Sequence, residues 1–436
     1  MTPFKVLALI VLAASPLAAQ SGGGRLDAEI DRRAAQVEGK VVAWRRDIHA
    51  HPELSNREVR TAQIVAEHLR ALGLEVRTGV AHNGVVGVLR GGRPGPVVAL
   101  RADMDALPVT EEVDVPFASK VRTQYNGQDV GVMHACGHDA HVAILMGVAE
   151  VLAGMRRDLP GTVKFIFQPA EEGVPSGEDG GAEMMIAEGA LDNPKPGAIF
   201  GLHVFPYPAG ELMYRPGAIM ASADGLRIVV RGRQTHGAQP WSGIDPIVVT
   251  SQIVLGLQTI ISRQVDITAA PGIVTIGAVH GGVRNNIIPD SVVMIGTIRA
   301  FDAAMRRDIW ARVRRTAEGI AQSAGATAIV TIDSGPPVTY NDPALTERMA
   351  PTLRRVVGSD RVGIAERKTP AEDFSRYQEK IPGLFFFLGI TPPGTDPASA
   401  APNHSPRFFV DEAALPVGVR ALAHLAVDYL SSAGGR

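Results

Sequence analysis

The sequence predicts an α/β protein built from two units: a large α/β sheet unit, and a smaller ferredoxin-like unit inserted into its chain. Three observations support this prediction. A chain of 436 residues is longer than one ordinary core supports. Apolar runs typical of buried strands alternate with segments of helical periodicity. From about Ser222 to Gly335 this pattern gives way to the element order βαββαβ, which forms a self-contained unit.

The first stretch of the large unit, residues 25–221, is predicted to alternate helices and strands. Apolar residues recur at helical spacing in four segments, and short apolar runs indicate five strands. The run at 96–101 is continuously apolar, as expected of a strand covered on both faces. The predicted helices are 25–49, 57–72, 142–152 and 180–189, and the predicted strands are 75–78, 84–90, 96–101, 162–167 and 197–204.

The inserted unit is predicted to span residues 222–335, and the large unit to resume over 336–436. Within the insertion the predicted strands are 226–233, 273–280, 292–301 and 327–332, and the predicted helices are 246–263 and 304–324. After it we expect a helix over 344–357, a strand over 384–389 and a closing helix over 415–431.

Composition and charge exclude several classes of function. Hydrophobic residues at 45% and charged residues at 20% are typical of a globular protein. The formal net charge of −2 offers neither a basic footprint for nucleic acid nor a polybasic membrane patch. No glycine-rich dinucleotide fingerprint opens a helix in the first unit, which argues against a dehydrogenase.

Residues 1–20 have the features of a cleavable signal peptide. Lys5 precedes a short apolar run over 6–14, and a zone of small residues follows. The run is too short for a membrane anchor, so we expect export to the periplasm or outside the cell. A buried first helix is the alternative. The sequence holds one cysteine, Cys136, which cannot form a disulfide within the chain, and metal ligation would explain its presence in an exported protein.

Donor-type side chains gather after predicted strands or at the starts of helices. Each group has an ordinary alternative, such as a solvated turn, acids at a helix N-terminus or a core histidine. If they converge on one rim of the sheet, they are too many for one tetrahedral ion and suit a pair about 3.5–4 Å apart. These residues are Asp103, Asp105, Cys136, His138, Glu171, Glu172, His203 and His404.

Such a donor set favours hydrolytic chemistry. A metal pair lowers the pKa of a shared water and polarises a carbonyl, while a neighbouring carboxylate takes the proton. Glu171 and Glu172 are adjacent, so one can ligate metal while the other faces the bound water. One thiolate and three imidazoles suit zinc, and the carboxylates admit manganese.

Five motifs follow one another along the chain: RADMDALP (101–108), HACGHDAH (134–141), QPAEEG (168–173), GLH (201–203) and NHSP (403–406). Together they resemble the motifs of metallopeptidase family M20. They resemble its amidohydrolase branch, which includes hippurate hydrolases, N-acyl-amino-acid amidohydrolases and auxin–amino-acid conjugate hydrolases. The resemblance runs from about Ala43 to the C-terminal helix.

The resemblance implies a role for each of these residues. Glu171 would be the general base, and Asp105 would orient a metal ligand. Asp103 stands where a related branch keeps a histidine ligand, so its ligation is left open. The implied ligands of two divalent metal ions, zinc or manganese, are Cys136, His138, Glu172, His203 and His404.

The resemblance also implies that the inserted unit is a lid or dimerisation domain, and hence a homodimer. His236 would stabilise the oxyanion, often from the partner subunit; alternatively it is an exposed loop histidine. Asn286 and Arg299 are candidates for holding the substrate carboxylate, although many strand arginines are merely solvated. The segment 205–208 and Trp241 either line the substrate pocket or simply pack.

The sequence thus predicts an exported two-metal hydrolase that cleaves the amide bond of N-acyl or N-aroyl amino acids. The alternatives are a metallo-dipeptidase or carboxypeptidase, and a metal-dependent binding protein without turnover. A nucleophilic Cys136 paired with His138 is less favoured, because immediate neighbours in sequence rarely reach in-line geometry. The acyl group and the amino acid are not identified.

Overall fold

A computed structural model describes residues 22–433, so the predicted signal peptide lies outside the described residues. The larger unit is organised around an eight-stranded sheet with the order β1-β2-β6-β3-β7-β18-β8-β17. Its central strands β6, β3, β7 and β18 run parallel to one another. The strands are β1 (Glu75–Val80), β2 (Gly84–Arg90), β3 (Arg93–Asp103), β6 (Pro160–Gln168), β7 (Ala198–Pro208), β8 (Leu212–Tyr214), β17 (Val362–Ile364) and β18 (Gly383–Thr391).

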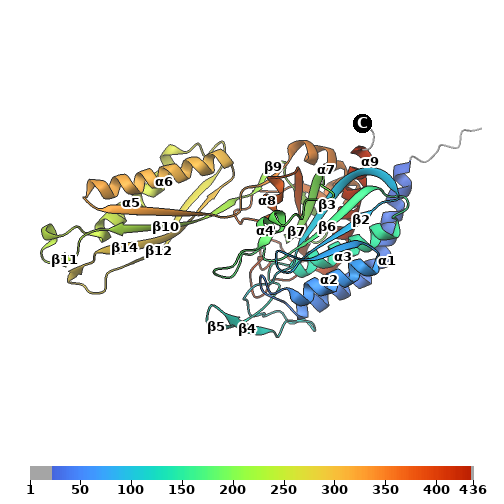
Figure 1. The fold of residues 1–436 in the computed structure, drawn as a ribbon, viewed down its shortest axis with the longest axis horizontal. Coiled ribbons are helices and arrows are strands. Elements are labelled where there is room, and N and C mark those ends of the chain that lie inside the picture. The colour runs from blue at the N-terminus through green and yellow to red at the C-terminus, as the bar shows by residue number, and fades with distance from the viewer. Residues whose placement is uncertain (1–21, 434–436) are drawn as a thin grey trace, which may run out of the picture.

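Helices cover both faces of this sheet, as expected for buried parallel strands. Five helices pack on one face and contribute to the largest core cluster, in which α3 is buried along almost its whole length (Figure 1). Two short helices, α4 and α8, contribute to a second core cluster. The helices of the unit are α1 (Gly22–Ala50), α2 (Val59–Ala71), α3 (His138–Gly154), α4 (Gly181–Ala187), α7 (Pro343–Val357), α8 (Phe374–Gln378) and α9 (Leu415–Ala433).

The register of the central strands explains where polar side chains collect. Strand β3 lies between β6 and β7, with Asp103 opposite Gln168 and Arg101 opposite Gly201. Because the three strands are parallel, the segments at their carboxyl ends share one edge of the sheet. The residues that follow β3 and β6 and the end of β7 therefore approach one another.

The inserted unit has its own four-stranded sheet with the order β12-β14-β10-β15, in which all neighbours are antiparallel. Helices α5 and α6 cover one face, giving the predicted βαββαβ order of a ferredoxin-like unit (Figure 1). The predicted α/β fold class is confirmed, whereas the domain boundaries stay predictions. The elements are β10 (Ser222–Arg231), α5 (Pro246–Thr259), β12 (Gly272–Gly281), β14 (Ser291–Ala300), α6 (Ala303–Ser323) and β15 (Thr327–Ser334).

Strand β7 runs further than its predicted end at residue 204, through Pro206 to Pro208. Prolines fit there because β3 pairs with β7 only as far as Gly201, which leaves that edge of β7 unpaired by β3. Several elements of two to four residues were not predicted, since their runs are too short to carry periodicity. The strands among them are β8 and β17 of the large sheet, together with β4 (Arg122–Tyr125), β5 (Gln128–Gly131), β9 (Gly217–Met220), β11 (Thr235–His236), β13 (Ile287–Ile288) and β16 (Thr339–Asn341).

Two helical segments are long and apolar enough to cross a membrane by length and composition alone. One, Glu412–Ser432, contains α9, and 72% of its apolar window is buried within the fold. Such burial is typical of a core helix. The other, Pro246–Gln264, contains α5 and is only 33% buried, because its outer face carries exposed apolar side chains.

Candidate metal centre

The five predicted metal ligands come together at the carboxyl edge of the large sheet. The Cys136 Sγ atom lies 3.3 Å from His203 Nε2. Donor atoms of Cys136, His138 and His203 all lie within 4.8 Å of one another, and so do those of Cys136, Glu172 and His404. The two groups share Cys136, so this residue would help to hold an ion in either group.

The turn before α3 fixes the positions of Cys136 and His138. Gly137 has a φ of +90°, and a Cβ atom there would come within 2.3 Å of Val204 Cγ2. Glycine therefore allows both the left-handed backbone and the close approach to β7. Helix α3 begins at His138, and its buried apolar sequence holds the two donors rigidly against the sheet.

The chemistry of the donor set fits divalent metal ions. His138 Nε2 and Glu172 Oε1 are buried and have no hydrogen-bond partner within the described chain, an arrangement that is costly unless something else satisfies them. Glu172 Oε1 lies 3.0 Å from His404 Nε2 without the geometry of a hydrogen bond. His203 Nδ1 donates to the carbonyl of Val204 at 2.7 Å, which leaves Nε2 free to ligate.

Asp105, predicted to orient a metal ligand, contacts two of the predicted ligands. Its Oδ1 lies 3.2 Å from His138 Nδ1, which directs Nε2 of that ring towards the other donors. Its Oδ2 accepts from Ser55 Oγ at 2.8 Å and from the Glu172 backbone N–H at 3.0 Å. One buried carboxylate thus connects two of the predicted ligands.

Asp103, whose ligation the sequence left open, is engaged elsewhere. One of its oxygens accepts from His141 Nδ1 and the other from the buried Arg101 guanidinium. The Val204 N–H donates to His141 Nε2 at 2.9 Å, so the proton of that ring is on Nδ1 and faces Asp103. The nearest ring nitrogen of His138 is 3.9 Å from Asp103. Asp103 therefore anchors the rim and is not favoured as a ligand.

Glu171 sits among acids that change its proton affinity. Burial, followed by the nearby carboxylates of Glu372 and Glu172, raises its pKa well above the ordinary value. The backbone N–H of Asp373 donates to Glu171 Oε1 at 3.3 Å. Arg101 lies 3.0 Å from Glu372 and 2.9 Å from Asp373, and so neutralises part of this cluster. A carboxyl group with a raised pKa beside a metal site suits proton transfer near neutral pH.

Two non-glycine residues of the site adopt a left-handed backbone conformation. Ala170, just before Glu171, has a φ of +54°, and His404 itself has a φ of +70°. Such conformations persist only where surrounding contacts impose them. The buried Glu58 accepts the N–H of Ala170 at 2.8 Å, while the N–H of His404 donates to Ala135 O at 2.8 Å.

Sequence reasoning missed the residues that hold these loops. Asn403 Nδ2 donates to the carbonyls of Cys136 at 3.1 Å and Val204 at 3.2 Å, joining three ligand-bearing segments. Glu58 and the Glu372–Asp373 pair were also missed as members of the site. Asn403 lies within the NHSP motif and Glu372–Asp373 is an acidic dipeptide, and these are the signals that could have found them.

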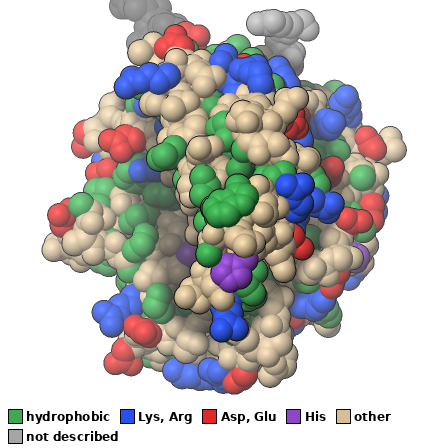
Figure 2. Space-filling view, turned by 90° about the vertical axis from the view of Figure 1, so that its left-hand side faces the viewer, with side chains coloured by type: hydrophobic (Ala, Val, Ile, Leu, Met, Phe, Trp, Pro, Cys, Tyr) green, Lys and Arg blue, Asp and Glu red, His purple; other side chains and the backbone are tan. Residues whose placement is uncertain are grey.

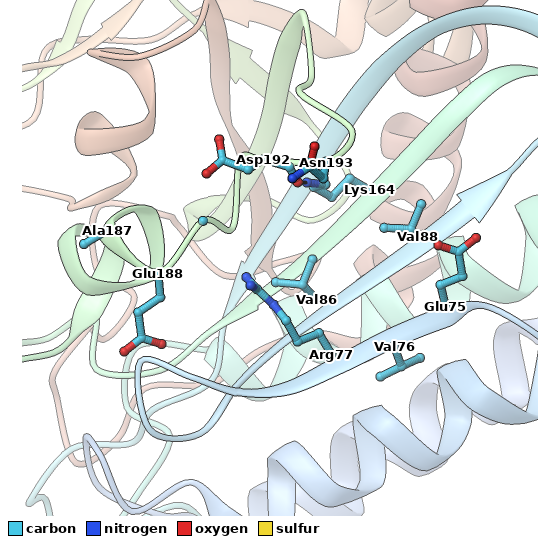
Figure 3. A pocket seen from close by; sticks show the side chains of 11 residues that line it. Glu75, Val76, Arg77, Val86, Val88, Lys164, Ala187, Glu188, Asp192 and Asn193 are labelled. Atoms are coloured by element: carbon cyan, nitrogen blue, oxygen red, sulfur yellow. Dashed lines mark hydrogen bonds between the residues drawn. The ribbon is translucent and has the colours of Figure 1, made fainter.

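A cavity of about 190 Å³ opens on the donors. It is lined by Cys136, Glu171, Glu172, His203, Phe205, Pro206, Met220, Pro370, Ala371, Glu372, Pro402, Asn403 and His404. Phe205 and Pro206 thus line the pocket, whereas Trp241 does not and is 79% exposed on the inserted unit. A second cavity of about 590 Å³ lies over β1, β2 and β6 around Lys164 and Arg77, and none of the predicted metal ligands lines it (Figure 3).

Three predicted residues of the inserted unit do not join the cluster within one chain. His236 is exposed on β11, which lies at the outer end of the unit (Figure 1). The N–H of the next residue, Gly237, donates to Asn286 O at 2.8 Å, so Asn286 lies close to His236. Arg299 lies on β14 opposite Ala223, near the end of that sheet where β10 starts, and burial lowers its pKa. None of the three lines the 190 Å³ cavity.

Comparison with known proteins agrees with this geometry. The profile of peptidase family M20/M25/M40 matches residues 99–428. The chain belongs to peptidase family M20. The M20 chain is 42% identical over 397 residues to thermostable carboxypeptidase 2 of Saccharolobus solfataricus, covering 90% of this chain and 96% of that protein. It is 39% identical over 395 residues to an N-acetylcysteine deacetylase of Bacillus subtilis, covering 90% and 97%.

Among solved structures, the M20 chain resembles the Bacillus subtilis YXEP protein, described as a dinuclear metal-binding peptidase of family M20. The TM-score is 0.77 at 37% identity, covering 91% of this chain and 99% of that chain. The resemblance to the amidohydrolase branch is confirmed. The M20 protein is a metal-dependent hydrolase of the amidohydrolase and peptidase type, and divalent metal ions are its expected cofactors.

Proposed function

We propose that the protein cleaves the amide bond of N-acyl or N-aroyl amino acids, using two divalent metal ions, zinc or manganese. The observation that carries the proposal is the convergence of five donor-type residues with Glu171 beside them, a carboxylate oxygen of Glu171 lying within 4.8 Å of donor atoms of His138 and Glu172. The five are Cys136, His138, Glu172, His203 and His404. The relative described as an N-acetylcysteine deacetylase supports an acyl amino acid as substrate.

In this proposal some residues of the chain hold the metal ions, one transfers the proton, and others orient these side chains. Bound metal ions would supply an activated water and polarise the scissile carbonyl. Glu171 takes the proton from the attacking water and later gives it to the leaving amine, a task for which its raised pKa suits it. Asp105 keeps His138 oriented, and the Asp373 N–H keeps the Glu171 carboxyl in position.

The cavity supports a compact, uncharged acyl group. Apart from the donors and acids, its wall consists of Phe205, Pro206, Met220, Pro370, Ala371, Pro402 and Asn403. No cationic side chain lines it in the described part of the chain, and the acids Glu171, Glu172 and Glu372 would repel an anionic acyl group at close range. Acetyl, short acyl and aroyl groups fit these walls best.

We also propose that the active form is a homodimer joined through the inserted unit. Its helix α5 exposes Ile247, Val248 and Leu255, and Figure 2 shows hydrophobic side chains exposed among charged ones at this end of the molecule. His236 and Asn286 are far from the cluster of their own chain and would serve the partner's site. Light scattering on the purified mature chain tests the proposal, and a one-chain mass would contradict it.

Export through the segment 1–20 is likewise a proposal, supported by the sequence features of that segment. Sequencing the N-terminus of the protein recovered from the extracytoplasmic fraction tests it. A mature chain that starts near residue 21 is expected. Full-length protein retained in the cytoplasm would contradict the proposal.

The proposed activity is tested with a panel of N-acetyl, N-benzoyl and longer N-acyl amino acids, assayed after chelation and after readdition of Zn²⁺ or Mn²⁺. We expect turnover that disappears with the chelator and returns with one of the ions. Metal-loaded protein that hydrolyses no member of the panel would contradict the proposal. Activity that survives complete metal removal would favour a Cys136 nucleophile.

A second candidate function is metallocarboxypeptidase activity, favoured by the 42% identical relative of that name. N-blocked dipeptides in the same panel distinguish the two activities. Cleavage of blocked dipeptides at a kcat/KM above that of simple acyl amino acids would favour the carboxypeptidase. A protein that binds the panel without turning it over would support the non-catalytic alternative.

A further inference from the structure

Lys368 is held beside the mouth of the metal cavity by its backbone. Its N–H donates to Ile219 O at 2.9 Å, and its carbonyl accepts from the Ala221 N–H at 3.0 Å. These bonds pair Lys368 with Met220, which lines the cavity. Pro370 and Ala371, which follow directly, line it as well. Hydrogen bonds at both the N–H and the carbonyl of Lys368 thus fix the position of its backbone.

The ammonium group lies above the strand that carries a metal ligand. Lys368 Nζ is 5.3 Å from the ring centre of Phe205 and 5.2 Å from that of Tyr207. Alternate residues of a strand share one face, so His203, Phe205 and Tyr207 point the same way, at steps of about 7 Å. The ring centres of His203 and Phe205 are 6.1 Å apart. The ammonium therefore stands on the order of 10 Å from the His203 ring.

The charge of Lys368 has no anionic partner in the described chain. No carboxylate lies within 4 Å of Nζ among residues 22–433, and no side chain or carbonyl there accepts a hydrogen bond from it, although the residue is half-buried. Aromatic faces stabilise a cation but leave its three N–H donors unused. The arrangement suits a carboxylate that arrives with a ligand.

The dimensions match a substrate of the proposed function, on which this inference rests. In an N-acyl amino acid the scissile carbon and the α-carboxylate are three bonds apart, roughly 4 Å. A charge-assisted hydrogen bond adds about 3 Å. A carboxylate bound to Lys368 would thus leave the scissile carbon close to the donors, whereas the residues that line the cavity include three glutamates and neither lysine nor arginine.

We propose that Lys368 binds the α-carboxylate of the leaving amino acid, and so selects substrates with a free carboxylate over the corresponding amides. The role is one of specificity and leaves the proton transfers to Glu171. It gives to Lys368 the carboxylate contact that the sequence analysis offered to Asn286 and Arg299; Arg299 lies on the other sheet.

The test compares Lys368→Met, which keeps the aliphatic stem, and Lys368→Arg with the wild type, on N-acetyl-methionine and N-acetyl-methioninamide. We expect Lys368→Met to lower kcat/KM for the carboxylate substrate about 10- to 100-fold, mainly through KM, and to leave the amide unchanged. Lys368→Arg should recover most of the difference. Arg367→Met is the matched control, because that neighbouring cation lies over Phe301.

Equal effects on both substrates, or none on either, would overturn the proposal. So would an effect confined to N-succinyl-methioninamide, whose only carboxylate is on the acyl side. Calorimetric binding of N-acetyl-methionine to metal-loaded Glu171→Gln, with and without Lys368→Met, separates this proposal from the hydrolase function. Lys368-dependent binding without wild-type turnover would uphold the carboxylate site and contradict the hydrolase; binding that does not depend on Lys368 would overturn the carboxylate site.

Discussion

The two sheets of the molecule treat polar side chains in opposite ways. The eight-stranded sheet is covered on both faces, and at its carboxyl edge it buries imidazoles, a thiol and carboxylates, some of them without partners. The four-stranded sheet has helices on one face only, and its predicted functional histidine is exposed. Buried, unpartnered donors mark a metal centre whose donors all come from one chain. An exposed residue far from that site needs a second chain to take part.

The difference in burial also explains why carboxyl groups of the large unit have shifted pKa values. Burial and neighbouring charges raise the pKa of Glu171, and the pKa values of Glu58 and Glu372 are raised to about 7. On the inserted unit His236 is exposed, so its contribution to the proposed reaction depends on where a second chain places it.

The largest predicted effect comes from removing Cys136, the residue that the two donor groups share. Cys136 belongs to both donor groups, whereas His404 belongs to one of them. We expect Cys136→Ala to reduce both metal occupancies and abolish turnover, while His404→Ala keeps about one ion per chain. Elemental analysis of the two purified variants measures this directly. Equal loss of metal in both variants would contradict a shared thiolate.

The second prediction tests whether the inserted unit acts across chains. His236→Ala should lower kcat by about 10²- to 10³-fold, as loss of an oxyanion donor does. Mixed with Glu171→Gln and allowed to exchange subunits, it should regain part of the lost activity, because hybrid sites combine an intact Glu171 with the partner's His236. Each variant exchanged with itself is the control. Absence of recovery in verified heterodimers would contradict action from the partner.

The smallest predicted effect concerns stability. Burial, and next the nearby Asp105, raise the pKa of Glu58 from 4.5 to about 7. Between these values the folded chain keeps a proton that the unfolded chain has lost, so the contribution of Glu58 to stability is full below pH 4.5 and falls as the pH rises to about 7.

The glutamine of Glu58→Gln does not titrate, so this variant should not lose folding stability as the pH rises from 4.5 to about 7. The free energy of unfolding that the wild type loses is on the order of 1–3 kcal/mol. Melting temperatures of wild type and variant, taken at pH 5 and pH 8 with chelator present, measure the difference. The melting temperature of the variant, relative to that of the wild type, should be higher at pH 8 than at pH 5. A difference that does not change with pH would show that Glu58 does not titrate between these values.

Much of the site could be predicted because each ligand stands next to a strongly patterned element. Glu171 and Glu172 follow a buried strand, His203 lies within one, and His138 opens an apolar helix. Parallel strands bring such positions to one edge whatever lies between them in sequence. The fold class and the inserted βαββαβ unit could be predicted because their helices and strands also have clear apolar patterns.

The supporting contacts could not be predicted, because they depend on how distant segments meet. Glu58 reaches Ala170 across 112 positions, and Asn403 reaches Cys136 across 267. The left-handed backbone at Ala170 had no sequence signal, since alanine rarely adopts that conformation. The position of His236 at the outer end of the unit required the length and direction of β10 and β14.

The central claim is that Glu171 moves the proton while its neighbours hold the metal. The most direct measurement is turnover and metal content of Glu171→Gln in one preparation. The account predicts unchanged metal stoichiometry with kcat lowered by about 10²- to 10⁴-fold. Full activity in the metal-loaded variant would contradict it.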